Sequence, residues 1–187
     1  MKLRMILVAA PSGAGKSSFV NRVTQELPQL VDVITYTTRP MRRGEVQGNP
    51  YHFISVEEFL EMRLKGLFVE WAQVHDNYYG NSYEQLGKVW EQDKVVIMDI
   101  DIQGCRTYKS KYPDAKTIFI LPPSIEELRR RIVARDGRVP ADIDLRMENA
   151  AKEMSCVDEF DFRLINDIFE DSYSQFKKII EQLLETE

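Results

Sequence analysis

The fold is decided by one stretch near the start of the chain, Met5-Ile6-Leu7-Val8-Ala9 followed by Ala10-Pro11-Ser12-Gly13-Ala14-Gly15-Lys16-Ser17-Ser18. An apolar strand, a loop with glycines and a Lys-Ser pair that opens a helix are typical of a cradle for nucleotide phosphates. Backbone N–H groups of such a loop converge on phosphate oxygens, and the helix adds the positive end of its dipole. Lys16 then reaches the β- and γ-phosphates, and the Ser17 hydroxyl ligates Mg²⁺.

One position departs from the G-x-x-x-x-G-K-[ST] pattern, because Ala10 occupies the place of the first glycine. Alanine is the smallest replacement, although it excludes a strongly positive φ at this position. The alternative interpretation is a turn between strand and helix with an incidental lysine. The apolar strand before the loop and the amphipathic helix after it argue against that alternative. We therefore predict that residues 10–18, named here the phosphate loop, bind ATP.

Length, charge and cysteine content narrow the class of protein. The 187 residues suit a single domain, and a net charge of −5 argues against a nucleic-acid-binding surface. Cys105 and Cys156 lack metal or redox spacing, so we expect reduced thiols and a cytoplasmic location. The first apolar run is too short for a signal peptide or a membrane span. We predict a protein that binds neither nucleic acid nor membrane, with monomer and homo-oligomer both open.

Strands alternate with helices along the chain, which predicts an α/β fold with a mainly parallel sheet flanked by helices. The predicted strands are 3–9, 31–36, 67–74, 94–100, 116–121 and 162–166. Four of the predicted helices are 15–27, 56–65, 142–154 and 172–184. A fifth starts at the capping box of Ser82 and ends near Gly87 or somewhat beyond. A sixth is capped by Ser124 and has Leu128 and Ile132 on its inner side. Residues 37–49 are predicted to form a long polar loop, and 129–138 a basic, flexible stretch.

The long loop carries a second group of candidate binding residues. It contains Arg39, Arg42 and Arg43, and Tyr51 follows shortly after it. Arginine forks bind phosphate oxygens in pairs, and a tyrosyl hydroxyl adds a neutral donor. The pattern favours a site for a second phosphate group. A solvated basic loop, or one paired with acidic neighbours, is the alternative.

A third group surrounds Glu70, a carboxylate in an otherwise apolar strand. Such a group is costly to bury unless something pairs with it, and guanine fits because its N1–H and N2–H₂ are adjacent donors. Thr35 or the Asn81 amide can serve the guanine O6, whereas adenine would place an acceptor against the carboxylate. A surface position on an edge strand is the alternative for Glu70. For Trp71, Tyr78 and Trp90 we expect core packing.

A fourth group, Asp99 and Asp101, ends a buried strand. Alternation puts both side chains on one side, at the edge of the sheet where α/β folds bind ligands. We expect them to position Mg²⁺ through water or to hold the acceptor, and helix capping is the alternative for Asp101. The arginines at 129, 130, 131, 135, 138 and 146 are candidates for a basic lid, of which Arg135 and Arg146 suit the role best. His52 and His75 are expected to be ordinary packing or surface residues.

Together these blocks resemble the guanylate kinase family over the whole chain. They are APSGAGKSS, TTRPMRRGEVQGNPYHF, FVEWAQVHDNYYGNS, DIDIQG, FILPPSIEELRRRI and INDIFED, in the family's order and spacing. The resemblance implies a P-loop nucleoside-monophosphate-kinase fold, with a core of residues 1–34, 83–125 and 156–187, a GMP-binding insertion at 35–82 and a lid at about 126–155. It also implies Mg²⁺-dependent transfer of the ATP γ-phosphoryl group to GMP, and to dGMP, in purine metabolism.

The resemblance also implies a role for individual residues. It assigns Arg39, Arg42, Tyr51 and Tyr79 to the GMP phosphate, Thr35, Glu70 and Asp101 to the guanine side, Arg135 and Arg146 to the lid, and Asn166 to the neighbourhood of the ATP base. Thr35 stands where the family often has serine, and Asn81 where it usually has serine or threonine; both replacements keep hydrogen-bonding ability. The catalytic residues implied are Lys16, Arg39, Arg135 and Arg146.

Two other functions fit parts of the pattern. Guanylate-kinase-like binding modules of scaffolding proteins keep the fold but are expected to lose the loop lysine, which this chain retains as Lys16. A related kinase for another phosphorylated small molecule would keep the phosphate loop. An assay over a panel of nucleoside monophosphates distinguishes these possibilities.

Overall fold

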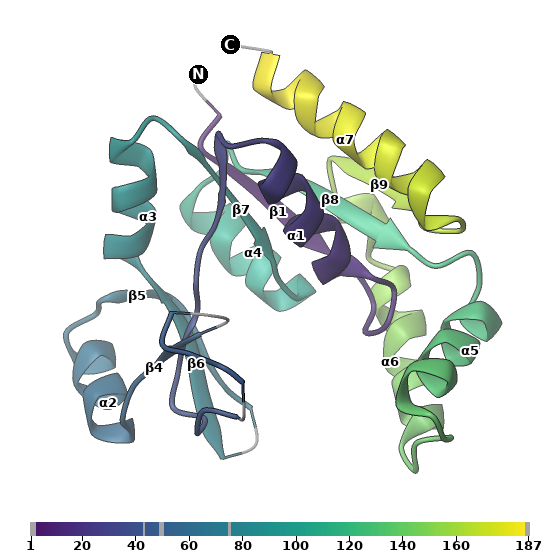
Figure 1. The fold of residues 1–187 in the computed structure, drawn as a ribbon, viewed down its shortest axis with the longest axis horizontal. Helices are drawn as coiled ribbons and strands as arrows, with labels where there is room; N and C mark the ends of the chain where they lie inside the picture. Colours follow the sequence, from purple (N-terminus) through teal and green to yellow (C-terminus); the bar gives the residue numbers. More distant parts are fainter. Residues whose placement is uncertain (1–2, 43, 49–50, 75, 186–187) are drawn as a thin grey trace.

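The computed structural model describes residues 3–42, 44–48, 51–74 and 76–185. Its larger sheet is parallel and consists of β1 (Met5–Ala9), β2 (Leu30–Asp32), β7 (Val95–Asp99), β8 (Lys116–Leu121) and β9 (Phe162–Ile165). The strands lie in the order β2-β7-β1-β8-β9, so β1 is central and leads directly into the phosphate loop (Figure 1). The predicted parallel sheet is therefore confirmed.

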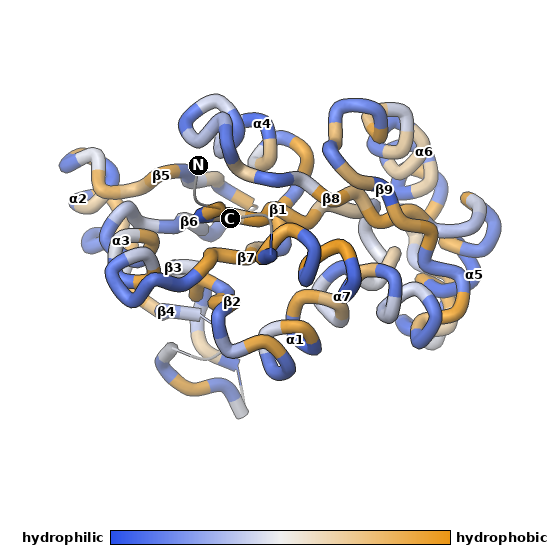
Figure 2. The backbone as a smooth tube through the Cα atoms, turned by 90° about the horizontal axis from the view of Figure 1, so that it is seen from above, coloured by the Kyte–Doolittle hydropathy of each residue, from blue (hydrophilic) through white to orange (hydrophobic). Residues whose placement is uncertain are grey.

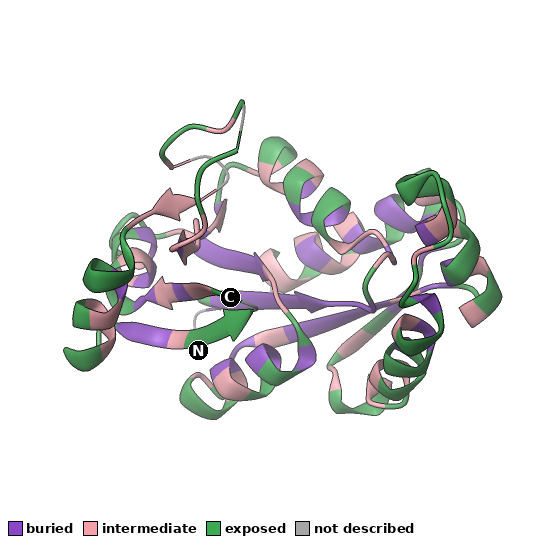
Figure 3. Cartoon of the chain, turned by 90° about the horizontal axis from the view of Figure 1, so that it is seen from below, coloured by how far each residue is buried: buried purple, intermediate pink, exposed green. Residues whose placement is uncertain are grey.

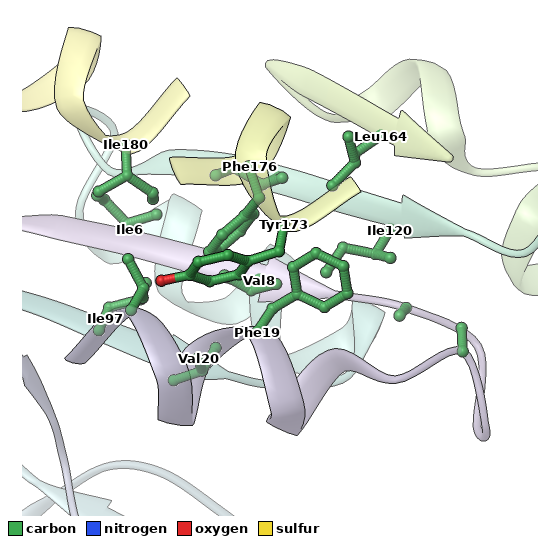
Figure 4. Close-up of a cluster of buried hydrophobic side chains, with 14 of the residues drawn as sticks. Ile6, Val8, Phe19, Val20, Ile97, Ile120, Leu164, Tyr173, Phe176 and Ile180 are labelled. Atoms are coloured by element: carbon green, nitrogen blue, oxygen red, sulfur yellow. The ribbon is translucent and has the colours of Figure 1, made fainter. Parts of the chain in front are cut away.

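Helices cover both faces of this sheet. One face carries α1 (Lys16–Glu26) and α7 (Phe169–Glu185), and the other carries α3 (Tyr83–Glu91) and α4 (Ile102–Lys111). Apolar residues concentrate along the central strands (Figure 2), and these strands are buried between more exposed helices (Figure 3). Between α1 and α7, the fully buried ring of Phe19 lies 5.2 Å from that of Phe176 (Figure 4). This packing fixes α1 and, at its start, the Lys16–Ser17 pair.

A second sheet lies between β2 and α3 in the sequence. It consists of β3 (Tyr36–Thr37), β4 (His52–Phe53), β5 (Phe68–Val74) and β6 (Asn77–Ser82), in the order β4-β3-β6-β5. Helix α2 (Val56–Leu64) begins with the predicted capping box at Ser55. It stacks the ring of Phe59 at 4.4 Å from Phe68 and at 5.3 Å from Tyr78. This small sheet therefore has an aromatic cluster of its own.

The helices α5 (Ile125–Asp136) and α6 (Ile143–Met154) form a pair that is followed by the 3-10 helix η1 (Val157–Glu159). Figure 1 shows this pair and the small sheet on opposite sides of the carboxyl end of the parallel sheet. As predicted, Ser124 caps α5, and Leu128 and Ile132 are buried. Within the described part of the chain, no helix has the length and apolar character needed to cross a membrane.

Three predictions of local structure are wrong. The expected strand 31–36 is divided, because β2 ends at Asp32 and the chain then crosses to the small sheet, where β3 begins. The stretch expected to be flexible is helical through Asp136, and Glu127 supports that helix by pairing with the arginines three and four residues later. Trp71 does not pack in a core: it is 42% exposed, with the Arg63 guanidinium 4.8 Å from its ring.

Other elements had no sequence prediction or differ only at their ends. Helix α4 and the strands β4 and β6 were not predicted, and α7 begins three residues before the predicted Ser172. Helix α3 continues past Gly87 to Glu91. Tyr78 and Trp90 are half-buried and packed, as expected, and His52 lies 5.0 Å from the Tyr36 ring. Arg43 and His75 fall outside the described residues.

Candidate active site

The phosphate loop connects β1 to α1 in the way the sequence predicts. Gly13 and Gly15 have φ angles of 93° and 96°, which side chains other than glycine rarely adopt. A Cβ atom at Gly15 would also lie 2.9 Å from Nδ2 of Asn166. Ala10 has no such requirement, since Asp93 is the single non-glycine residue with positive φ in the described ranges. Alanine at the first position of the motif is therefore compatible with the loop.

Two side chains of the phosphate loop, Lys16 and Ser17, contact the end of β7 and the residue that follows it. The Lys16 ammonium donates to the carbonyl oxygen of Ile100 at 2.9 Å, and the Ser17 hydroxyl donates to the Asp99 carboxylate at 2.5 Å. Over the loop lies a cavity of about 570 Å³, which we call the loop cavity. It is lined by residues 10–13 and 15–18 together with Asp99, Asp101, Arg131, Ile132, Arg135 and Glu153.

Asn166 supports the loop from below. Its side chain is buried, and its Nδ2 donates to the carbonyl oxygen of Ala14 at 2.8 Å. The buried Oδ1 of the same amide accepts no hydrogen bond from the residues that the structure describes. The structure thus places the predicted ATP-base residue against the backbone of the phosphate loop.

The two aspartates at the end of β7 both line the loop cavity, as the alternation predicts. Asp99 is the last residue of the strand, whereas Asp101 is the N-cap of α4. The Asp101 carboxylate accepts from the backbone N–H of Gly104 at 2.7 Å. The capping alternative for Asp101 is therefore confirmed, and it coexists with the position at the cavity.

A second cavity, of about 420 Å³, lies between the parallel sheet and the small sheet; we call it the sheet cavity. Four of the residues predicted to bind the acceptor line it, namely Thr35, Tyr51, Tyr79 and Asn81. The Asn81 amide donates to the Thr35 hydroxyl at 3.2 Å, so these two groups are already adjacent. Ser17 and Asp99 line both cavities. The two cavities therefore meet at the Ser17–Asp99 hydrogen bond.

Glu70 lies on β5 beside the first turn of α4. Burial and, to a lesser extent, the negative charge of Asp101 raise the pKa of the Glu70 carboxyl to about 7, while Lys111 opposes this rise. The approach to the helix is close, because a Cβ atom on Gly104 would lie 3.0 Å from Oε2 of Glu70. A half-buried carboxylate of this kind is suited to accept from a ligand with adjacent donors.

The two described arginines of the long loop, Arg39 and Arg42, do not line the sheet cavity. The Arg39 guanidinium pairs with Glu45 at 2.8 Å, and both side chains are largely buried. The Glu45 carboxylate also accepts from the backbone N–H of Arg42 at 2.7 Å, while Arg42 itself is exposed. Among the described residues that line the sheet cavity, neither arginine is included. The structure therefore brings Tyr51 and Tyr79 to the wall of the sheet cavity. Arg39 lies beside this wall, with its guanidinium 5.4 Å from the centre of the Tyr51 ring, but is not among the residues that line the cavity.

Comparison with known proteins covers the whole chain. The guanylate kinase family model matches residues 2–183. The chain belongs to the guanylate kinase family. A curated guanylate kinase of Bdellovibrio bacteriovorus is 60% identical over 184 residues, which are 98% of this chain and 100% of the relative. One of Nitratidesulfovibrio vulgaris is 38% identical over 184 residues, covering 98% of this chain and 89% of the relative.

The solved structures agree with this membership. The crystal structure of guanylate kinase from Anaplasma phagocytophilum superposes with a TM-score of 0.73 at 28% identity, covering 99% of this chain and 87% of that one. The chain is thus a nucleoside monophosphate kinase with the guanylate kinase fold. The reaction known for guanylate kinases is ATP-dependent phosphorylation of GMP, which needs adjoining places for two nucleotides.

The predicted lid arginines of this guanylate kinase lie on α5 and α6. Arg135 pairs with Asp136 at 2.7 Å and lines the loop cavity. Arg146 pairs with Asp142 at 2.9 Å and also approaches Asp136 at 3.8 Å, but it is not among the residues lining the loop cavity. Both guanidinium groups therefore have carboxylate partners from their own segment.

Arg131 is one of the basic-lid candidates, whereas Asp32 and Glu153 were missed by sequence reasoning. Arg131 lines the loop cavity and donates to the carbonyl oxygens of Asn166 and Asp167 at 2.8 and 2.9 Å. Asp32 lines the sheet cavity, where burial and then the charge of Asp99 raise its pKa to about 7. Glu153 lines the loop cavity, and burial raises its pKa. A carboxylate in an apolar strand, the signal used for Glu70, would also have found Asp32.

Proposed function

We propose that this chain transfers the γ-phosphoryl group of ATP to GMP across the junction of the loop cavity and the sheet cavity. The observation that carries the proposal is that Ser17 and Asp99 line both cavities. ATP on the phosphate loop directs its γ-phosphate toward this junction, and GMP in the sheet cavity approaches it from the other side. Adjoining sites hold the reacting atoms in place, which removes much of the entropic barrier to transfer.

On the donor side, we assign residues 10–18 to the ATP phosphates. The loop offers backbone N–H groups at the start of α1, and Lys16 supplies a positive charge that leaves Ile100 for the β- and γ-phosphates. Asn166 keeps the loop in shape through Ala14 and is assigned to the ATP side on that basis.

For the cofactor we propose Mg²⁺, which supplies charge neutralisation on the phosphates when it is bound. The Ser17 hydroxyl and the Asp99 carboxylate fit this ion, because they are oxygen donors that already meet at 2.5 Å. Within the described residues, no group of three or more His, Cys, Asp or Glu side chains could hold a metal alone. A site of this kind therefore suits an ion whose other ligands are phosphate oxygens and water.

On the acceptor side, Glu70 accepts from guanine N1–H and N2–H₂, and Thr35 with Asn81 provides the donor for O6. We place Asp101 beside the same base, because its negative charge is close enough to Glu70 to raise the pKa of that carboxyl. Tyr51 and Tyr79 bind the GMP phosphate from the wall of the sheet cavity. None of these contacts uses the ribose 2′-hydroxyl, so we expect dGMP to be accepted as well.

The phosphate-binding arginines reach their targets on closure. We propose that residues 35–82 form a GMP-binding unit and residues of about 126–155 a lid, which move against the core. In support, the small sheet has its own aromatic cluster, and Arg39, Arg135 and Arg146 are held by carboxylates of their own segments. Substrate phosphates can replace those carboxylates and draw the segments together.

Transfer itself is a direct in-line displacement without a covalent enzyme intermediate. An oxygen of the GMP phosphate forms a bond to the γ-phosphorus while the bond to the β–γ bridging oxygen breaks, leaving ADP. The attacking oxygen is already anionic, so no general base is required. Lys16 and the lid arginines stabilise the charge of the transferring group, and closure excludes water as a competing acceptor.

The setting that we propose is the cytoplasm. Cys105 is buried and Cys156 is half-buried, and both are free thiols. This supports the reducing compartment expected from their spacing.

A coupled assay of ADP release tests the proposed function. The chain is incubated with ATP, Mg²⁺ and, in turn, GMP, dGMP, AMP, CMP and UMP. We expect turnover with GMP and dGMP that disappears when Mg²⁺ is chelated. Turnover that is equal across the panel, or none with GMP, would contradict the acceptor assignment.

A further inference from the structure

Strand β5 contains a β-bulge directly before Glu70. Phe68 pairs with Ser82 and Glu70 pairs with Asn81, so Val69 is one residue too many for the register with β6. Bulges of this kind occur beside active sites, where they change the direction of a side chain. Here the side chains of Phe68 and Val69 are both buried, and the bulge between Phe68 and Glu70 sets the register in which Glu70 pairs with Asn81.

Lys111 holds this bulge from the last turn of α4. Its ammonium donates to the carbonyl oxygen of Val69 in a short hydrogen bond, and to the Tyr83 hydroxyl at 3.2 Å. The same ammonium lies 5.5 Å from the centre of the Tyr83 ring. One side chain therefore ties together α4, the bulge of β5 and the start of α3.

The charges around Glu70 give Lys111 a second effect. The groups whose electrostatic interaction with Glu70 is resolved all belong to α4 and its N-cap: Asp101, Cys105, Tyr108 and Lys111. Of these four, Lys111 is the cation. It lowers the pKa of Glu70, against burial and Asp101, which raise it. Loss of this cation would leave the carboxylate with only unfavourable influences from that helix.

We propose that Lys111 is a positioning residue for acceptor recognition, which holds the Val69 bulge so that the Glu70 carboxylate is directed at the guanine. The inference rests on the proposed role of Glu70 in binding guanine. Lys111 acts through Glu70 and the Val69 carbonyl and does not touch the nucleotide. Its influence is therefore on the KM for GMP, and it leaves the phosphate loop unaffected.

The test is a comparison of Lys111→Met with wild type at pH 7 and pH 9. Methionine keeps a long apolar side chain but removes the charge and the donors. At pH 7 we expect the KM for GMP to rise about fivefold or more, because a further rise of roughly one unit in a pKa of about 7 lowers the ionised fraction of Glu70 about fivefold. At pH 9 the part of this rise that comes from the charge of Glu70 should disappear, because Glu70 is then ionised in both proteins, while the part that comes from the lost contact with Val69 should remain. The KM for ATP and kcat should stay within about twofold of wild type.

Four further variants make the result specific. Lys111→Arg keeps the cation and should restore a KM for GMP close to wild type. Lys88→Met is the matched control, since Lys88 pairs with Glu84 on the exposed face of α3, and it should change neither KM. In a Glu70→Gln background, Lys111→Met should add little, because the two residues act through one contact. Lys111→Gln keeps an N–H donor without the charge and substitutes for Lys111→Met if that variant does not fold.

The outcomes separate this inference from the proposed function. If wild type does not phosphorylate GMP, or if Glu70→Gln leaves its KM unchanged, the acceptor site is wrong and this inference falls with it. If both behave as proposed but the Lys111 variants match wild type, Lys111 has no positioning role. A rise in KM that is equal for ATP and GMP indicates general structural damage and also refutes the inference.

Discussion

The two halves of the site are built in different ways. The phosphate loop is a backbone structure fixed between β1 and α1, with Ala14 fully buried and Asn166 held against it. The acceptor half relies on side chains from strands of a small sheet, and one of its arginines, Arg39, is paired with Glu45. The backbone fixes the first half, whereas the second half, as we propose it, requires Arg39 to exchange Glu45 for a substrate phosphate.

This difference teaches where each kind of substitution should act. A preformed backbone site needs only its mobile charge, Lys16, to complete it, so damage there should appear in the rate of transfer. The side chains of the acceptor half contribute mainly to binding GMP, so substitutions there should change the KM for GMP. The predictions that follow test this division.

The largest effect is expected from Lys16→Ala. We assign the Lys16 ammonium, which is bonded to the Ile100 carbonyl, to the β- and γ-phosphates, and its loss should lower kcat by about 10²-fold or more. Steady-state kinetics measure this, with circular dichroism as the check on folding. A folded variant with near-normal turnover would remove Lys16 from the mechanism and return the binding-module interpretation.

The next effect is expected from Arg39→Met on the acceptor half. Loss of a charged hydrogen bond to the GMP phosphate should lower kcat/KM for GMP by roughly 10- to 100-fold. The KM for ATP should change little, and this contrast is the part that tests the division. Arg63→Met, which removes an arginine stacked on Trp71 on the same small sheet, is the matched control. Equal losses for both nucleotides would show that the two halves are not separable.

The smallest effect concerns Asp32, a buried carboxyl that lines the sheet cavity. Its pKa is raised from 3.8 to about 7, so the folded protein favours the protonated form. It loses stability relative to the unfolded chain as the pH rises from about 4 to about 7, and the loss is complete above 7. Asp32→Asn should therefore raise the free energy of unfolding by about 2 kcal/mol at pH 8, with little effect at pH 4.

Urea unfolding of the ligand-free protein measures this difference, with the exposed Asp158→Asn as the control. A gain at pH 4 as large as that at pH 8 would show that the Asp32 charge is not the cause.

Sequence reasoning predicted the two halves unequally well. The phosphate loop was found residue by residue, because its strand, loop and helix are consecutive and its requirements are local. Thr35, Tyr51, Tyr79 and Asn81 were also found, and they do line one cavity. The strand predicted over 31–36 failed because only the tertiary structure determines that the chain leaves one sheet for another at this point.

Contacts between segments that are far apart in the sequence could not be predicted from the sequence alone. Lys111 meets Val69 across 42 positions of sequence, and Arg131 reaches Asn166 across 35. The pairing of Arg39 with Glu45 was equally hidden, because a loop sequence does not show which partner its arginines take in the absence of a ligand. A spacing pattern predicts which groups can bind, but not whether they are already in place.

The most direct test of the account is the discrimination between GMP and AMP by wild type and Glu70→Gln. A site built to accept from N1–H and N2–H₂ should favour GMP over AMP by roughly 10⁴ or more in kcat/KM. Glu70→Gln should lower the value for GMP and narrow the gap, since a rotated amide can donate to adenine N1, while the KM for ATP stays nearly constant. If wild type used AMP as well as GMP, or if Glu70→Gln left the ratio unchanged, Glu70 would not be the residue that reads the base.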